Sequence, residues 1–514
     1  MHGVSPDEDR DMWRQSMSYM GVDVGTTGCK AVIFDERGKQ IASAYREYPV
    51  LSPQEGFAEL DSRHVGDCCL ESIAEATAVC PGDPVCAIGV SSQGEAFTAI
   101  GADGAVMGNG MVSSDARASR IAVEWSEEFG RERLYQITGH TAHPMFSVFK
   151  LLWVRDNQPD VWSGAAKFLC YEDFLHHRLG VEPAISWPLA GRTMLFDIRR
   201  HIWSQEILES IGLEEEHLSR VLPSGEIVGK VAAPAAFALG LADDVIVVTG
   251  GHDQPCGALG AGVMQSGRSM YATGTVECLC PMFAEPVLSD SLMGSNLCTY
   301  DYTVRGKYTT VAFNLTGGNL LKWFRDEWGR GEVDEARRTG SDPYALVLDQ
   351  MPEEPTRLMA LPYFTPSGTP YFDPDVSGAI LGLRLTTTRG EVLKALLEGL
   401  SFEMRLNLDI MARSGIAIDQ LLAIGGGAKN RKWLQLKSDV MNKPITTVAV
   451  TEAACFGAAM LACAAHQRED VTAIASGWVR EVDCIEPNPA RAAYYDERFE
   501  KYVELYPKLK RIEV

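Results

Sequence analysis

The sequence predicts an α/β protein of two similar halves, and three observations support this fold class. The segment 19–34 reads as strand, Gly-Thr turn and strand, and the segment 268–279 repeats that order. A continuous apolar run at 245–248 is typical of a short strand that is covered on both faces. The repeated order indicates a weak internal duplication, with one β-meander opening each half.

Polar residues follow the apolar run 245–248 directly. Thr249-Gly250-Gly251 allows a sharp turn, and His252, Asp253 and Gln254 come next. Open α/β sheets hold ligands beyond the carboxyl ends of their strands, so Asp253 is a candidate general base that faces a cleft. Asp253 is equally suited to cap a helix beginning at Gln254-Pro255, because Asp is common at the N-cap and Pro near N1. The two interpretations are compatible.

The composition bounds the size and the charge of the molecule. The chain has 514 residues, which is long enough for two or more domains with sizeable cores. Hydrophobic residues make up 46% and charged residues 23%, as is ordinary for globular proteins. The net charge of −22 argues against a broad surface for nucleic acid or for an anionic membrane. It leaves room for a local basic site that binds nucleotide phosphates.

Cysteine usage and the N-terminus predict a cytoplasmic protein. The chain has 13 cysteines, an odd number, and lacks a C-x-x-C pair, which favours reduced and mostly buried thiols. No apolar run approaches the ~20 residues that a bilayer-spanning helix needs. Residues 1–17 are acidic and lack the apolar region of a signal peptide, so we expect a frayed leader.

Two further strand ends carry candidate binding residues. Gln93 and Glu95 follow a predicted strand at 87–92 and are candidates for binding substrate hydroxyls, although a solvated turn explains them equally well. In the first meander, the turn 25–28 offers amides and hydroxyls for phosphate oxygens, and nearby Asp23 is suited to hydrated Mg²⁺. Taken alone, this turn is better explained as a plain glycine-rich hairpin.

A run of three glycines, 425–427, lies between a predicted strand at 421–424 and a helix from 430. Bare backbone next to a helix N-terminus suits a flat, negatively charged ligand. Tight packing of strand on helix is the alternative. The ligand interpretation is favoured because glycines beyond those that the turn requires cost stability. The P-loop pattern G-x-x-x-x-G-K-[ST] does not occur.

Several of these motifs occur in a fixed order along the chain. They are DVGTTGCK at 23–30, SDARA at 114–118, GGHDQ at 250–254, YATGT at 271–275, GTPYFDP at 368–374, EGLSFEMR at 398–405 and GGGAKN at 425–430. Each motif is a weak signal, but the ordered set resembles the FGGY family of carbohydrate kinases over about residues 18–480.

The resemblance implies two ribonuclease-H-like domains of the actin-like ATPase type, each a mixed β-sheet with flanking helices, and a cleft between them. Residues 18–263 would hold the acceptor sugar and the phosphates, residues 264–480 would bind the nucleotide, and residues 481–514 would form a helical tail. The implied reaction is transfer of the γ-phosphoryl group of ATP, with Mg²⁺, to a hydroxyl of a sugar or polyol.

The resemblance also implies roles for single residues. Asp253 matches the base that accepts the hydroxyl proton, and Asp23 matches the carboxylate near Mg²⁺. Residues matching acceptor-binding positions are Gln93, Glu95, Asp253 and Gln254. Residues matching nucleotide-binding positions are Thr26 and Thr27 in the first hairpin, Gly274 and Thr275 in the second, and Gly318, Gly426, Gly427 and Asn430 around the adenosine.

The acceptor is less closely specified. The turn 92–95 resembles the Asn-Gln-Arg-Glu turn of glycerol kinases, but Gly94 replaces the Arg, and Ser113 stands where those enzymes carry a Trp. Both changes predict a larger pocket, so we expect a ketopentose such as xylulose, or a sugar alcohol of about five carbons. Xylulose kinases usually carry Met-His at the turn that matches 92–95 and Asp-Asn at the turn of Asp253, and this chain has Ser-Gln-Gly-Glu and Asp-Gln there.

Other functions remain as alternatives. They are a glycerol kinase-like enzyme and a non-catalytic sugar-binding regulator of the same fold, and the presence of Asp253 argues against the regulator. A chaperone-like ATPase would need a peptide-binding domain, and only about 50 residues follow the last core helix. At the level of the family we expect a homodimer, with no nucleic-acid or membrane partner.

Overall fold

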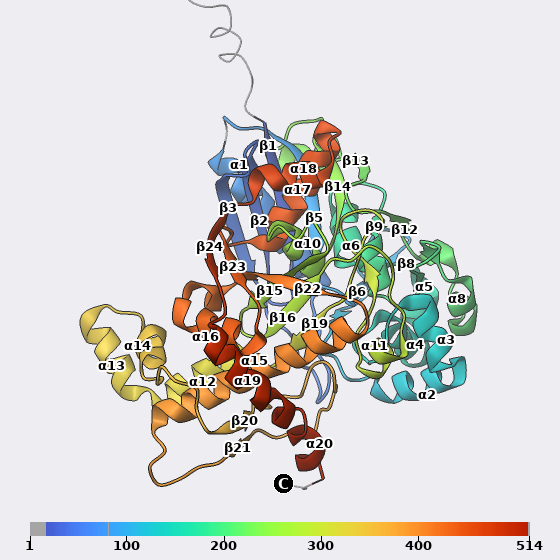
Figure 1. The fold of residues 1–514 in the computed structure, drawn as a ribbon. Coiled ribbons are helices and arrows are strands. Elements are labelled where there is room, and N and C mark those ends of the chain that lie inside the picture. The colour runs from blue at the N-terminus through green and yellow to red at the C-terminus, as the bar shows by residue number, and fades with distance from the viewer. Residues whose placement is uncertain (1–16, 81, 512–514) are drawn as a thin grey trace, which may run out of the picture.

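The computed structural model describes residues 17–80 and 82–511 (Figure 1). Residues 1–16 of the predicted leader 1–17 lie outside this part of the chain, and Met17 packs against the core. Within the described ranges, no helix is both long enough and apolar enough to cross a membrane.

Two six-stranded mixed sheets organise the chain, and they share one strand pattern. In each sheet a three-stranded antiparallel meander is followed by two parallel strands and an antiparallel edge strand. The first sheet has the order β13 (Ile227–Lys230), β14 (Ile246–His252), β5 (Val85–Ser92), β1 (Ser18–Val24), β2 (Gly28–Asp35), β3 (Gln40–Glu47). The second has the order β19 (Ala312–Asn314), β16 (Glu277–Pro281), β15 (Gly267–Thr273), β22 (Ile418–Ile424), β23 (Ile445–Val448), β24 (Glu481–Ile485). The predicted α/β class and the predicted duplication are therefore confirmed.

Three helices fill the space between the two sheets: α10 (Asp253–Gly260), α17 (Ala453–Gln467) and α18 (Val471–Trp478). Helices α10 and α17 cross in backbone contact, because a β-carbon at Gly260 would lie 2.1 Å from the carbonyl oxygen of Ala453. A β-carbon at Gly457 would similarly lie 2.0 Å from the carbonyl oxygen of Cys256. Since α10 begins at Asp253, this close crossing fixes the helix that carries the candidate base.

Other helices cover the outer faces of the sheets. On the first sheet these are α1 (Ser62–Val79), α6 (Tyr171–Arg178) and α9 (Ala233–Ala238). On the second they are α15 (Arg389–Arg413), α16 (Arg431–Met441) and α19 (Pro489–Tyr502). Helix α15 starts with a capping box, in which Thr388 and Glu391 bind each other's backbone amides.

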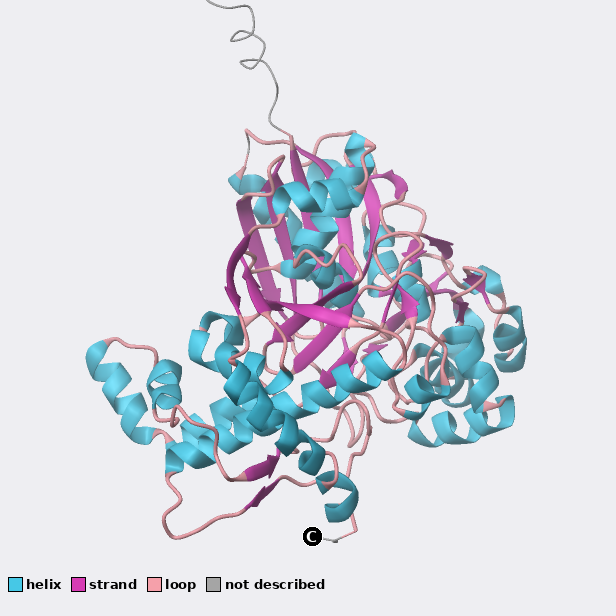
Figure 2. Cartoon of the chain, viewed as in Figure 1, coloured by secondary structure: helices cyan, strands magenta, loops and turns pink. Residues whose placement is uncertain are grey.

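A smaller layer lies beside the first sheet and appears as a cluster of helices in Figure 2. Its four-stranded sheet has the order β4 (Glu59–Leu60), β7 (Gly110–Met111), β6 (Phe97–Gly101), β8 (Ala165–Cys170). Its helices are α2 (Ser119–Phe129), α3 (Arg131–Thr138), α4 (Ser147–Asn157), α5 (Pro159–Gly164), α7 (Trp187–Gly191) and α8 (Gln205–Ile211). Two short strand pairs follow in this part of the chain: β9 (Ala184–Ser186) with β12 (Arg220–Leu222), and β10 (Phe196–Asp197) with β11 (Ile202–Trp203).

The second half carries further elements around its sheet. They are α11 (Asp290–Gly294), β17 (Tyr300–Asp301), β18 (Tyr308–Thr309), α12 (Gly318–Trp328), α13 (Arg330–Thr339), α14 (Pro343–Asp349), β20 (Met359–Leu361), β21 (Ala379–Leu381) and α20 (Leu505–Leu509).

The segment 481–514, predicted as a helical tail, begins instead with a strand. Strand β24 pairs with β23 and completes the second sheet, and α19 and α20 follow it. Four of the five residues of β24 are exposed, and only Ile485 is buried. The strand therefore lacks the apolar pattern that a sequence shows for a buried strand, and backbone pairing at the free edge of β23 forms it.

Candidate active site

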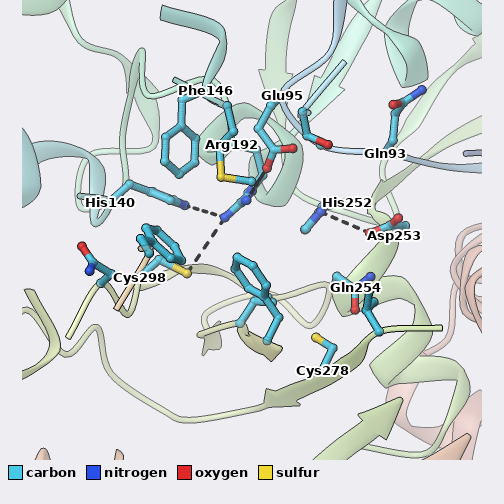
Figure 3. A pocket seen from close by; sticks show the side chains of 18 of the residues that line it. Gln93, Glu95, His140, Phe146, Arg192, His252, Asp253, Gln254, Cys278 and Cys298 are labelled. Carbon is cyan, nitrogen blue, oxygen red and sulfur yellow. Dashed lines mark hydrogen bonds and ion pairs between the residues drawn. The ribbon is translucent and has the colours of Figure 1, made fainter. Parts of the chain in front are cut away.

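Asp253 lies where strand β14 ends and helix α10 begins. His252 occupies the N-cap position, Asp253 is the first helical residue, and no side chain makes a capping hydrogen bond here. The predicted capping role of Asp253 is therefore wrong. The carboxylate lines a cavity of about 200 Å³ instead (Figure 3).

The cavity gathers the polar residues that follow three parallel strands. Strands β1 and β14 both run parallel to β5, so the carboxyl ends of all three meet at one edge of the sheet. From these ends come the cavity-lining residues Thr26, Gln93, Glu95, Asp253 and Gln254. The structure thus brings together all four predicted acceptor-binding residues. It also places Thr26, predicted as a nucleotide-binding residue, in the wall of this cavity.

The opposite wall comes from the second half of the chain. It includes Val276 and Cys278 from the second hairpin, with Cys298, Phe313 and Phe372 from later segments. The cavity is therefore a cleft between the two halves, as the resemblance implies.

The Asp253 carboxyl lies in an environment that disfavours its charge. Burial, followed by the negative charges of Asp23 and Glu95, raises its pKa to about 7. Its Oδ1 atom is buried without a hydrogen-bond partner, although Nε2 of His252 lies 3.1 Å away. The side chain keeps 30% of its exposure, toward the cavity. A carboxyl group with this pKa can accept a proton at neutral pH.

Gln93 connects the cavity to the first hairpin. Its Oε1 accepts a hydrogen bond from the Thr26 hydroxyl at 3.0 Å, and its Nε2 donates to the carbonyl of Gly25 at 3.1 Å. Gln93 therefore holds the hairpin turn against the cavity wall.

Arg192 is the main cavity residue that sequence reasoning missed. It follows α7, and its Nε donates to Oε1 of Glu95 at 2.5 Å (Figure 3). Its Nη1 donates to Nε2 of His140 at 3.1 Å. Nδ1 of His140 lies 2.8 Å from the carbonyl oxygen of Thr138, which can only accept, so Nδ1 carries the proton and Nε2 accepts from Arg192. Burial and the charge of Arg192 lower the pKa of His140 to about 3, so the ring is neutral.

The space in front of Gly94 is occupied. A β-carbon at Gly94 would lie 3.0 Å from ring atoms of His252 and 3.4 Å from Nε of Arg192. The extra room that the missing arginine predicts is therefore filled by these two side chains. Ser113 does line the cavity.

Asp23 and Thr27 lie outside the lining of this cavity and of the second one described below. Oδ1 of Asp23 accepts a hydrogen bond from the Ser91 hydroxyl at 2.8 Å. Burial, with a smaller contribution from the charge of Glu452, raises the pKa of Asp23 to about 6. Thr27 is exposed in the hairpin turn.

A second cavity, of about 570 Å³, lies in the second half of the chain. Six predicted nucleotide-binding residues line it: Gly274, Thr275, Gly318, Gly426, Gly427 and Asn430. Asn430 is also the N-cap of α16, and its side chain accepts from the backbone amide of Trp433 at 3.0 Å. The glycine run 425–427 thus leads into the cavity wall and then into a capped helix N-terminus.

Close backbone packing builds the wall of this second cavity. The amide of Gly318 donates to the carbonyl of Gly274 at 2.9 Å, which ties the start of α12 to the second hairpin. A β-carbon at Gly318 would lie 2.6 Å from that carbonyl oxygen, so the contact requires glycine. Side chains that sequence reasoning did not predict complete the wall: Lys322, Tyr344, Leu348 and Trp433. They come from three different helices and carry no common motif.

Comparisons with known proteins agree with the two-domain architecture and with the predicted family. The model of the FGGY family of carbohydrate kinases, N-terminal domain, matches residues 18–260, and that of the C-terminal domain matches residues 270–466. Xylulose kinase of Bacillus subtilis (strain 168) is 25% identical over 498 residues, covering 96% of this chain and 98% of the relative. Glycerol kinase of Ligilactobacillus salivarius (strain UCC118) is 30% identical over 460 residues, covering 86% and 88%.

A solved structure agrees with these matches. A xyloylose kinase from Brucella ovis superposes with a TM-score of 0.87 at 27% identity, covering 96% of this chain and 100% of that one. Both family domains, the two mixed sheets and the cleft between them lead to one conclusion. The chain belongs to the FGGY family of carbohydrate kinases, and it is a phosphotransferase with an alcohol group as acceptor.

Proposed function

We propose that this kinase transfers the γ-phosphoryl group of ATP to a hydroxyl of a ketopentose such as xylulose, or of a sugar alcohol of about five carbons. The observation that carries the proposal is the Asp253 carboxylate, which faces a cleft between the halves and whose buried Oδ1 accepts no hydrogen bond. The similarity to kinases named for xylulose and for glycerol supports an acceptor of this size range.

The polar groups of the cavity suit a neutral polyhydroxyl compound. Asp253, Glu95 and the unpaired Oε1 of Gln254 accept hydrogen bonds, which sugar hydroxyls donate. Arg192 is the cation among the lining residues described, and Glu95 already pairs with it. An acceptor that carries a carboxylate of its own, such as an aldonate, would be repelled by the uncompensated negative charge of Asp253.

The cleft supports a direct displacement. Asp253 would accept the proton of the attacking hydroxyl, while the two Gly-Thr hairpins would hold the phosphates and the second cavity the adenosine. Phosphoryl transfer depends mainly on positioning and on charge stabilisation, so a single carboxylate base is sufficient. Closure of the cleft would exclude water, which competes as an acceptor.

Mg²⁺ fits the acidic residues of this site. Asp253 has an unpaired Oδ1, and the charge of Asp23 raises its pKa, so a cation near both carboxylates would relieve their repulsion. In the described part of the chain, no group of three or more His, Cys, Asp or Glu side chains is arranged to hold a metal. Mg²⁺ in kinases is commonly bound by one or two carboxylates plus substrate phosphates, and there it neutralises phosphate charge. Asp23 would be such a ligand, and Asp253 would stay free to act as the base. The expected homodimer stays a prediction.

An acceptor panel tests the proposal. ADP release is measured with ketopentoses, pentitols, tetritols, glycerol and gluconate, with Mg²⁺ present. We expect a ketopentose or pentitol to give the highest kcat/KM, and gluconate the lowest. Preference for glycerol would support the glycerol kinase-like alternative. Tight acceptor binding without ADP release would support the regulator.

A further inference from the structure

Phe372 reaches the acceptor cavity from the second half of the chain. It lies in the segment between β20 and β21, and it lines the cavity together with Asp253 and Glu95. Its ring centroid is 5.0 Å from that of His143, in the loop before α4, and 5.5 Å from that of Phe313. The side chain therefore closes the cavity by crossing from one half to the other.

The backbone of Phe372 is held in an unfavourable conformation. Its φ angle is +48°, in the left-handed region that bulky residues rarely adopt. Such a conformation persists only where the surrounding structure enforces it. Here the amide of Phe372 donates to the carbonyl of Gly368 at 2.9 Å, and the amide of Asp373 donates to the Ser367 hydroxyl at 2.8 Å.

The C-terminal helix supplies a second restraint on the same turn. Oδ2 of Asp373 accepts a hydrogen bond from the Tyr506 hydroxyl at 2.6 Å and an ion pair from Nζ of Lys510 at 2.7 Å. The Tyr506 ring also stacks on Tyr371, with centroids 3.8 Å apart. We call these two contacts to Asp373, from Tyr506 and Lys510, the C-terminal clasp. Figure 1 shows α20 beside β20 and β21, where the clasp forms.

Helix α20 contacts both the core and the turn that carries Phe372. It packs the partly buried side chains of Leu505, Tyr506 and Leu509 against the core, although none of its residues is fully buried. The polar groups of Tyr506 and Lys510 bind the carboxylate of Asp373, the residue next to Phe372. The Asp373 side chain is only 10% exposed.

We propose that Phe372 determines how tightly the acceptor binds, and that the C-terminal clasp is the device that positions it. This inference rests on the proposed function, because it takes the cavity as the acceptor site. It makes Tyr506 and Lys510 positioning residues that act on the acceptor from outside the cavity.

The test uses the full-length chain with conservative substitutions. Tyr506→Phe keeps the stacking on Tyr371 and removes the hydroxyl, and Lys510→Met removes the charge. Lys508→Met on the same helix is the matched control, because Lys508 pairs with Glu504 and not with Asp373. The KM values for acceptor and for ATP, kcat and the melting temperature are measured for each.

We expect the Tyr506→Phe/Lys510→Met double variant to raise the acceptor KM about five- to tenfold, with the ATP KM within about twofold of the parent. Phe372→Ala should raise the acceptor KM as well. In the Phe372→Ala background the clasp substitutions should then add no further change, since they act through the missing ring. The control should match the parent.

Hydrogen exchange gives a readout that needs no turnover. Amides of residues 363–376 should exchange faster in the double variant than in the parent or in the Lys508→Met control. Unchanged exchange, an equal rise in both KM values, or effects that add to those of Phe372→Ala would each overturn the inference. If exchange is faster in the double variant but the parent phosphorylates no acceptor, the proposed function is overturned and the restraint of the turn by the clasp stays supported.

Discussion

Arg192 binds the carboxylate of Glu95 across 97 residues of sequence, with Nε 2.5 Å from Oε1. Both side chains are less than 10% exposed, and both line the acceptor cavity. The pair therefore fixes the orientation of Glu95, which is available to an acceptor hydroxyl only from the cavity side.

Removing one member of this pair should damage both binding and folding. Arg192→Met leaves Glu95 buried and uncompensated, so we expect the free energy of unfolding to fall by about 3 kcal/mol and the acceptor KM to rise. In the Arg192→Met/Glu95→Gln double variant, stability should recover in part, because the unpaired charge is gone. Urea denaturation of the parent, Arg192→Met, Glu95→Gln and the double variant measures the coupling energy between the two side chains. Additive losses would show that the two side chains do not interact.

The activity should depend on the ionisation of Asp253. Its pKa is about 7, and the base must be deprotonated, so kcat/KM for the acceptor should fall about tenfold per pH unit below that value. A flat profile between pH 5 and 8 would contradict this assignment.

The same pKa predicts a trend in stability. The folded-state pKa lies above the ordinary value of 3.8, so the unfolded chain loses this proton first. The contribution of Asp253 to the free energy of unfolding is therefore fully present below about pH 3.8, and it is lost as the pH rises through about 7. Asp253→Asn should therefore raise the melting temperature, relative to the parent, more at pH 8 than at pH 5. An equal change at both pH values would argue against the raised pKa.

A substitution at Gly426 tests whether the second cavity binds the nucleotide, because an added side chain would enter the cavity without meeting other protein atoms. A β-carbon at Gly426 would meet no atom within 4 Å, whereas one at Gly427 would lie 2.9 Å from the carbonyl oxygen of Thr273. Gly426→Val should therefore raise the ATP KM about tenfold with little change in melting temperature, and Gly427→Val should lower both stability and ATP affinity. Gly331→Ala, also free of contacts, is the surface control. An unchanged ATP KM in Gly426→Val would remove this cavity from the nucleotide site.

Glu172 supports the strand that carries Asp253. Its Oε1 accepts from the amide of Gly250 at 2.8 Å, at the point where the pairing of β14 with β5 shifts register. Its Oε2 accepts from the amide of Ser186 at 2.9 Å, so the amide group of Glu172→Gln must face one of two backbone donors. We expect a loss of about 1–3 kcal/mol of stability and a lower kcat with the ATP KM unchanged. Glu182→Gln, at an exposed site, is the control. A parent-like kcat in Glu172→Gln would show that the bulge does not position Asp253.

The polar ends of the parallel strands could be predicted from the sequence because short-range signals define them. Gln93, Glu95 and Asp253 each follow an apolar run and a glycine or turn residue, and parallel strands end at one edge of a sheet. The repeated hairpins likewise predict the duplicated sheets.

The rest of the site depends on tertiary contacts that leave no periodic signal. Arg192, His140 and Phe372 come from loops. Arg192 binds Glu95 and His140 across 97 and 52 residues of sequence, and Phe372 contacts His143 in the other half of the chain. Strand β24 is similar, since four of its five residues are exposed and its backbone pairs with β23. Such contacts follow from packing between layers, which spacing along the chain does not encode.

The measurement that tests the central claim most directly is ADP release by Asp253→Asn with the preferred acceptor, beside ATP binding by calorimetry. The account predicts that kcat falls by about 10²–10⁴-fold, because the hydroxyl loses its base, while the affinity for ATP and the fold are unchanged. Parent-like turnover in Asp253→Asn would contradict it.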